Sequence, residues 1–336
     1  MDLLPMGYAE RAWRLQDAEA IAEMINAYSK QVSGRETVAL DSVRAQLEMP
    51  GLDLSTDTRL VLSPEGELAA AGFAIDLSDP HVKVQASGYV RHENQRRGIG
   101  TWLADWIEGR AREAIERAPE GARVSLLQTT DDRDESAKRL LESRGYEIVR
   151  HFWRMAVDLD DAGSNPVWPD GITVTTLGDG VDLRQAYRAG REAFEDHWGH
   201  VETPEDEGFE RFTHRLRTDP DIDMSLRFVA MDGDEMVGVC YATPREGTDE
   251  TTGYVEVLGV RPTWRKRGIA LALLHHSFGE LRKRGLHACA LHVDSESLTG
   301  ATRLYESAGM SISELNHAYE LELSPGVELS RTGVEA

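Results

Sequence analysis

Hydrophobic and polar positions follow the same order twice along the chain. Each half contains two apolar runs that a short acidic, glycine-containing turn separates, TRLVLSPEGELAAAGFAID in the first half and LRFVAMDGDEMVGVCYAT in the second. Apolar runs bounded by turn residues predict pairs of β-strands. A short strand and two helices are expected before each pair. The two halves are therefore predicted to begin alike.

The pattern after these strands is also shared. A third strand leads into a helix whose apolar residues recur on one face, Ile99, Leu103, Trp106, Ile107 and Ala114 in the first half and Leu274, Phe278 and Leu281 in the second. A strand (RVSLLQT or HACALHV), a second helix and a final pair of strands complete each half. Gly145 and Gly309 stand where a helix C-cap needs a left-handed residue.

The strongest repeat lies between the third strand and its helix. Residues 90–103 read VRHENQRRGIGTWL and residues 260–273 read VRPTWRKRGIALAL. This repetition indicates a tandem duplication, and the stretch DLDDAGSNPVWPDG at 158–171 has the composition of a linker. We therefore predict two domains, 1–160 and 168–336. Each is an α/β (α+β) fold with a mixed central sheet flanked by helices.

Composition and charge narrow the function. The chain has 336 residues with a formal net charge of -22, which disfavours binding to a nucleic-acid backbone. No apolar run reaches the roughly 20 residues of a membrane span and Met1–Gly7 does not resemble a secretory signal. We expect a cytoplasmic protein with no membrane partner. Cys240 and Cys289 lie in apolar runs and are expected to be buried thiols.

The repeated loop has a physical use. A strand at 254–260 runs into a basic turn that opens a helix, and the unpaired N–H groups of a helix N-terminus bind phosphate. Gly268 allows a ligand to approach the main chain, and Ala270, or Gly100 in the first copy, keeps the next turn thin. The spacing is neither that of a nucleotide-binding P-loop nor the three-glycine dinucleotide motif. It is Gln/Arg-x-x-Gly-x-Gly/Ala.

This motif resembles that of the general N-acetyltransferase (GNAT) superfamily, in which the loop holds the pyrophosphate of acetyl-coenzyme A (acetyl-CoA). The resemblance implies these coenzyme-binding residues: Leu258, Val260, Arg265, Lys266, Arg267, Gly268, Ile269 and Ala270 in the second half, and Gln95, Arg96, Arg97, Gly98 and Gly100 in the first. The second-half run LGVRP, RGIA, LHVDSES and RLYESAGM is most similar to a two-domain branch of the family. Members of that branch acetylate the amine of a sugar-cysteine thiol.

Acetyl transfer to an amine needs a polarised thioester carbonyl, a proton acceptor and a proton donor. In the family a main-chain N–H of a splayed strand polarises the carbonyl, here from residues 258–260. Strict alternation over 254–260 places Tyr254, Glu256 and Leu258 on one face and Val255 and Val257 on the other.

Glu256 is then a candidate general base, directly or through water, with a pKa that partial burial would raise. The alternative is a strand glutamate that pairs with an arginine or faces solvent.

Tyr305 is the candidate general acid. A phenol is protonated at neutral pH and can donate to the leaving thiolate. The alternative is a tyrosine that packs beneath its helix. In the first copy the positions of Glu256 and Tyr305 hold Ala86 and Leu141. We therefore predict a catalytic second domain and a first domain retained for binding, packing or shaping the acceptor cleft.

The acceptor site is expected in REAFEDHWGHVETPEDEGFERF at 191–212. His197, Trp198 and His200 stand among acidic residues and could bind a cationic or sugar-like amine, with Trp198 offering a stacking face. A solvated acidic turn is the alternative. The spacing matches no metal-binding signature, and no metal is expected.

The function predicted is acetyl-CoA-dependent N-acetylation of a small-molecule primary amine, with coenzyme A as the second product. Acetylation of a sugar-cysteine amine is one alternative, and a non-catalytic acyl-CoA-binding module is another. The protein is expected to be a monomer or a homodimer that binds no nucleic acid.

Overall fold

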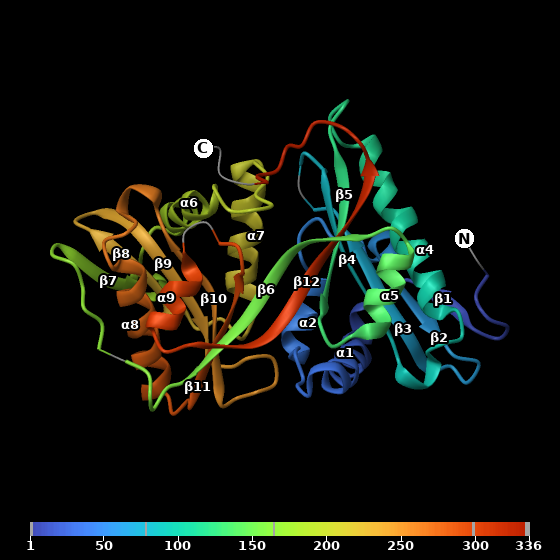
Figure 1. Cartoon of the computed structure of the whole chain (residues 1–336), viewed down its shortest axis with the longest axis horizontal. Coiled ribbons are helices and arrows are strands. Elements are labelled where there is room, and N and C mark those ends of the chain that lie inside the picture. The colour runs from blue at the N-terminus through green and yellow to red at the C-terminus, as the bar shows by residue number, and fades with distance from the viewer. Residues whose placement is uncertain (1–2, 78, 164, 298–299, 333–336) are drawn as a thin grey trace. The chain divides into compact units, whose positions relative to one another are not determined.

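The chain folds into two compact units, and both contain β-strands and helices (Figure 1). The computed structural model describes residues 3–77, 79–163, 165–297 and 300–332. The first unit runs to His151 and also contains Thr203–Arg211 and Asn316–Leu329. The second contains Phe152–Glu202, Phe212–Leu315 and the residues from Ser330 on.

Among the described residues, the strands of the first unit pair in the order β1-β2-β3-β4-β5-β12. All neighbours are antiparallel except β4 and β5. Its strands are β1 (Ala9–Arg11), β2 (Thr58–Leu62), β3 (Leu68–Ile75), β4 (Lys83–Val90), β5 (Val124–Asp131) and the end of β12 (Ser311–Ser324). Its helices are α1 (Ala18–Ser33), α2 (Leu40–Leu47), α3 (Leu54–Asp57), α4 (Ile99–Arg112) and α5 (Glu135–Ser143).

The second unit repeats this arrangement in the order β7-β8-β9-β10-β11-β6, and β10 and β11 are its parallel pair. Its strands are β6 (Glu147–Asp158), β7 (Ile172–Thr176), β8 (Arg227–Asp232), β9 (Glu235–Thr243), β10 (Thr252–Val260) and β11 (Ala288–Asp294). The helices that follow the second-half pattern are α6 (Leu183–Phe194), α7 (Glu205–Thr218), α8 (Ile269–Lys283) and α9 (Ala301–Ser307).

The last strand of each half pairs with the sheet of the other half. β6 pairs with β11 in the register Met155 to Leu291, and β12 pairs with β5 in the register Leu321 to Leu126. The expectation of a final strand pair in each half is wrong, because each half ends in one long strand. Alternating apolar residues identify a strand but not its neighbour. The predicted boundary between residues 160 and 168 therefore separates β6 from its partner β11 and β12 from its partner β5.

Helices cover both faces of the sheet in each unit, as the fold class predicted from the sequence requires. In β8 of the second unit, Phe228 and Ala230 belong to a core cluster with α8 residues such as Phe278. Val229 belongs to another cluster, with Ala186 and Ala189 of α6. Successive strand residues point to opposite faces, so α8 and α6 lie on opposite sides of the sheet. The first unit likewise has two core clusters, one with α4 and one with α1.

Two further expectations can be compared with the structure. Cys240 and Cys289 are free thiols buried in the second unit's core, which confirms the prediction from their apolar surroundings. Among the described residues, every helix is too short or too polar to pass through a lipid bilayer.

Candidate functional site

The parallel strands β10 and β11 run together for three residue pairs and then separate. The last pair in register is Tyr254 with Ala290. Beyond it β10 continues to Val260 along β9, while β11 continues to Asp294 along β6. In the described registers, the main chain of β10 after Tyr254 is therefore not paired with β11.

A β-bulge marks the point of separation. The register between β10 and β9 shifts between Val255 and Val257, so Glu256 is the extra residue. Val255 packs in the cluster with α8, whereas Val257 packs against the cluster with α6. The predicted alternation, which placed both valines on one face, is wrong because the bulge inserts one residue into the period of two.

Glu256 is held by two arginines. Arg215 of α7 and Arg227 of β8 both donate to its carboxylate, and Arg227 is almost fully buried. Burial works to raise the pKa of Glu256, but the charges and hydrogen bonds of Arg227 and Arg215 outweigh it and hold the pKa below its usual value. The expectation of a raised pKa is wrong, and the glutamate is ion-paired.

Tyr305 lies on α9 and packs into the second unit's core with 7% of its surface exposed. Burial raises its pKa, and the neighbouring Cys240 and Tyr254 raise it further. The phenol thus stays protonated across the physiological range. The end of α9 is closed by Gly309 with φ 88°, and Gly145 closes α5 in the same way with φ 84°.

The two copies of the glycine loop share one backbone conformation. Lys266 and Gly268 have φ of 61° and 88°, and Arg96 and Gly98 have 58° and 83°. A Cβ on Gly268 would meet no protein atom within 4 Å, so the positive φ rather than crowding requires the glycine. Gly268 is the N-cap of α8 without a side-chain cap, so the first N–H groups of the helix have no intrahelical acceptor.

The three cations of the loop have different surroundings. Arg265 turns inward, where its guanidinium pairs with Asp196 and donates to the carbonyl oxygens of Ala193 and Val260, both at 3.0 Å. It therefore ties the loop to the end of α6. Lys266 and Arg267 are exposed beside the helix N-terminus. In the first copy Gln95 occupies the place of Arg265 and donates to Val90 at 3.5 Å.

The predicted acceptor residues lie on the segment after α6. The ring of Trp198 contacts that of Phe152, which pairs with Asp294 at the end of β11. His197 packs against Phe194, and its burial is the main cause that lowers its pKa. His200 bonds to Arg331 through the backbone.

Two pairs were missed by the sequence analysis. One is Arg215 with Arg227 around Glu256. The other is Tyr254 with His292, whose Oη and Nδ1 are 2.8 Å apart. A histidine that interrupts the apolar run ACALHV was a signal of the same kind as Glu256 in YVEVLGV. Arg215 and Arg227 carried no such signal, because their helix α7 and strand β8 are distant in sequence from Glu256 on β10.

In the first unit the parallel strands β4 and β5 also separate, but no glutamate or tyrosine occupies the positions of Glu256 and Tyr305. β4 and β5 stay in register up to Ala86 and Gln128, and β4 keeps a continuous register with β3 through Val90. A cavity of about 150 Å³ lies where the strands part, lined in part by Gly88, Gly100, Ala104 and Leu141. Val90 and Gly100, which also line it, lie on either side of the loop that contains Gly98.

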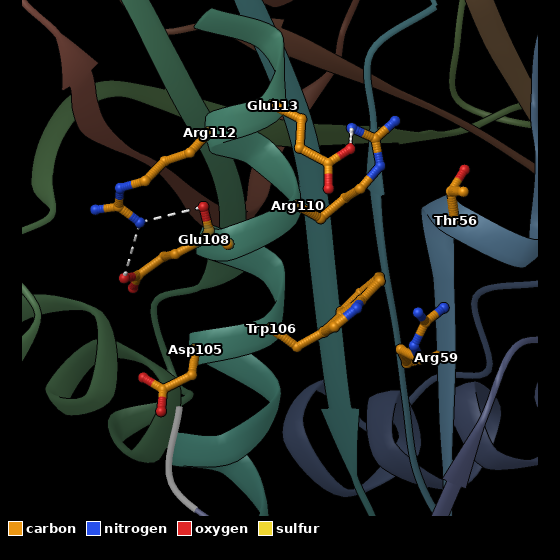
Figure 2. Close-up of a pocket in the computed structure, with 9 residues that line it drawn as sticks. Thr56, Arg59, Asp105, Trp106, Glu108, Arg110, Arg112 and Glu113 are labelled. Carbon is orange, nitrogen blue, oxygen red and sulfur yellow. Dashed lines mark hydrogen bonds and ion pairs between the residues drawn. The ribbon is translucent and has the colours of Figure 1, made fainter.

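A second hollow in the first unit, of about 470 Å³, lies along α4 and contains none of the predicted site residues (Figure 2). Arg110 pairs with Glu113 at 3.2 Å and Arg112 with Glu108 at 3.8 Å. The other charged side chains that line it, Arg59 and Asp105, have ion-pair partners too. Its charges are thus satisfied within the protein.

Comparison with known proteins identifies similar chains. A family model described as "Acetyltransferase (GNAT) family" matches residues 184–310. Mycothiol acetyltransferase of Geodermatophilus obscurus is 28% identical over 288 residues, 82% of this chain and 88% of that protein. The Thermobispora bispora protein of the same name is 33% identical over 184 residues, 52% of this chain and 59% of its own.

Solved structures agree with these matches. A GCN5-related N-acetyltransferase from Sphaerobacter thermophilus has a TM-score of 0.78 and 34% identity, covering 99% of this chain and 100% of its own. A tandem GNAT protein from the clavulanic acid biosynthesis pathway has a TM-score of 0.71 and 14% identity, covering 95% and 100%, and shows the fold alone.

Proposed function

Because the chain belongs to the GCN5-related N-acetyltransferase (GNAT) family, we propose that its second half transfers the acetyl group of acetyl-CoA to a primary amine of a small molecule. One observation carries this proposal. β10 separates from β11 after Tyr254, bulges at Glu256 and leads into the N-cap Gly268. The diverging main chain can receive the thioester carbonyl, and the helix N-terminus can receive the pyrophosphate.

The reaction then needs two proton transfers. The amine nitrogen attacks the thioester carbon after losing a proton, the carbon–sulfur bond breaks, and the thiolate takes a proton to give coenzyme A and an N-acetyl product. We assign the second transfer to Tyr305, whose raised pKa keeps it protonated. Lys266 and Arg267 are the exposed cations that we place beside the pyrophosphate.

Glu256 has a more limited role than the sequence indicates. A carboxylate with a lowered pKa is a weak proton acceptor. Its lowered pKa would make it a weak general base even if it acted through water. Arg215 and Arg227 hold the carboxylate in place and compensate its charge, so we assign Glu256 to ordering this part of the site.

For the first half we propose coenzyme binding without turnover. Its loop has the same backbone as the second copy, and Val90 and Gly100 on either side of it line a cavity of about 150 Å³. Ala86 and Leu141, however, can neither accept nor donate a proton.

A sugar-cysteine amine is the more specific acceptor that the comparisons support. Relatives named mycothiol acetyltransferase align with most of the chain. We place the acceptor against His197, Trp198 and His200, where Trp198 offers a ring for stacking.

Release of coenzyme A tests the proposal. The purified protein, acetyl-CoA and a panel of primary amines that includes a sugar-cysteine amine are mixed, and free thiol is measured with and without each amine. We expect amine-dependent release and an N-acetyl product by mass spectrometry. Calorimetric binding of acetyl-CoA without release from any amine would favour the non-catalytic acyl-CoA-binding module instead.

A further inference from the structure

Residues 330 and 331 lie against the predicted acceptor segment. Ser330 forms an antiparallel bridge with Val201. The N–H of Arg331 donates to the carbonyl oxygen of His200 at 2.9 Å, and the carbonyl oxygen of Arg331 accepts from the N–H of Gly199 at 2.7 Å. Two main-chain hydrogen bonds and a bridge thus join two parts of the second unit that are far apart in sequence.

The segment that these bonds hold is a turn that carries Trp198. The N–H of His200 donates to the carbonyl oxygen of His197 at 3.1 Å, which closes a four-residue β-turn. Gly199, the third residue of the turn, has φ 77°, a left-handed conformation that glycine adopts without steric cost. Trp198 is the second residue, and its ring contacts that of Phe152. The conformation of the turn therefore decides where the ring of Trp198 is held.

The two sides of the turn are anchored by different contacts. Before the turn, Asp196 pairs with Arg265, which joins the segment to the glycine loop. After the turn, Glu202 pairs with Arg191, but the glutamate is exposed, and an exposed ion pair is a weak restraint. The main-chain bonds to residue 331 are therefore the firmer restraint on this side.

We propose that Arg331 is a positioning residue of the acceptor site, because its main chain holds the turn 197–200 that presents Trp198 and His200 to the amine. The inference rests on the proposed function, in which these two residues contact the acceptor. A turn that is already held in one conformation binds its ligand more tightly, since less conformational entropy is lost on binding. The side chain of Arg331 is exposed and takes no part in these two bonds.

The test compares Arg331→Pro with two controls in the full-length chain. Proline has no N–H and cannot donate to His200, whereas Arg331→Ala removes the side chain and keeps the N–H. Thr332→Pro introduces the same ring one residue later and leaves the N–H and carbonyl of Arg331 in place. Thermal unfolding first checks that all three variants are folded.

Steady-state kinetics then separate positioning from chemistry. We expect Arg331→Pro to raise the KM for the amine about tenfold, the effect of losing one hydrogen bond. The kcat and the KM for acetyl-CoA should stay within about twofold, because the pair of Asp196 with Arg265 on the other side of the turn is unchanged. Arg331→Ala and Thr332→Pro should match the wild type in all three quantities.

Hydrogen exchange gives a readout that needs no turnover. The amide of Gly199 donates to the carbonyl oxygen of Arg331, so it should be protected in the wild type and in both controls. In Arg331→Pro it should exchange about tenfold faster, since the remaining bond opens more often.

Each other result overturns the proposal. An unchanged KM for the amine in Arg331→Pro would show that the tail does not position the acceptor site. An equal rise in Arg331→Ala would assign the effect to the side chain, and an equal fall in acetyl-CoA affinity would indicate a general loss of structure. If the wild type acetylates no amine, the proposed function itself fails. Unchanged exchange at Gly199 in Arg331→Pro refutes the hold on the turn independently of turnover.

Discussion

Both halves open the corresponding pair of strands, after Ala86 and Gln128 in the first unit and after Tyr254 and Ala290 in the second, with different side chains and a different register. In the first unit β4 is regular and a cavity remains beside Gly88 and Leu141. In the second unit β10 bulges, and the matched positions hold Leu258 and Tyr305. The glycine loops nevertheless agree in φ within 5° at each left-handed residue. The backbone that we propose holds a pyrophosphate is thus retained independently of the groups that we propose move protons.

Tyr305 gives the largest expected contrast between the halves. If it protonates the leaving thiolate, Tyr305→Phe removes the donor and keeps the packing volume, so kcat should fall about a hundred- to a thousandfold. The affinity for acetyl-CoA should stay within about twofold. Steady-state kinetics and calorimetry measure the two quantities.

Tyr146→Phe is the control for this change. Tyr146 is buried in the first unit and its hydroxyl accepts from Gln128 at 2.9 Å. Its loss should affect stability alone. Equal falls in kcat for both variants would remove the distinction between a catalytic and a binding half.

Glu256 gives the next largest effect, on stability. Glu256→Gln leaves the buried Arg227 without its carboxylate, which should destabilise the second unit by about 3 kcal/mol. Because the folded-state pKa of Glu256 lies below its usual value, this stabilisation is complete above the unfolded value of about 4.5 and is lost as the pH falls through the folded one. The variant should lose that part of the acid dependence.

Urea unfolding between pH 7 and pH 3 measures both effects. Glu250→Gln serves as the matched control, since Glu250 is exposed on the turn before β10. It should leave the unfolding free energy unchanged. Unaltered acid dependence in Glu256→Gln would show that the two ion pairs contribute nothing to folding.

The contrast between the halves shows which features a sequence can predict. The duplication, the loop and the helices follow from local patterns, and the structure confirms the mixed sheet with helices on both faces. The bulge at Glu256 was not predicted, because it depends on β9 offering one residue fewer than β10. The pairing of β6 with β11 and of β12 with β5 was missed for a related reason, because tertiary packing decides which strands become neighbours.

The candidate site was predicted unevenly. Gly268 and Gly98 were identified from the repeated local motif, and the structure adds that both have the left-handed backbone that favours glycine. The direction of the pKa shift at Glu256 was wrong because Arg215 and Arg227 come from α7 and β8, which the strand pattern cannot place. The ion pair of Arg265 with Asp196 could not be predicted either, because it depends on where α6 ends.

A moderate effect is expected from the glycines of the two loops. Gly268→Ala places a side chain at φ 88°, which costs about 1 kcal/mol and distorts the helix N-terminus. The KM for acetyl-CoA in turnover should rise about tenfold. Gly98→Ala imposes the same strain on the first copy and should leave turnover within twofold, while calorimetry detects weaker binding at one of two sites. The reverse pattern would assign catalysis to the first half.

The smallest expected effect concerns Gly100, which lines the first cavity at the position that Ala270 occupies in the second copy. A Cβ there would lie 3.7 Å from Leu140 and 3.8 Å from Val90, ordinary contact distances. Gly100→Ala should therefore stabilise α4 by about 0.5–1 kcal/mol, as alanine does within helices. Because the second half already has alanine here, coenzyme binding by the first half should not change. Thermal unfolding measures the stability and calorimetry measures coenzyme binding. Weaker binding would show that the first half needs the space that an alanine side chain fills in the second half.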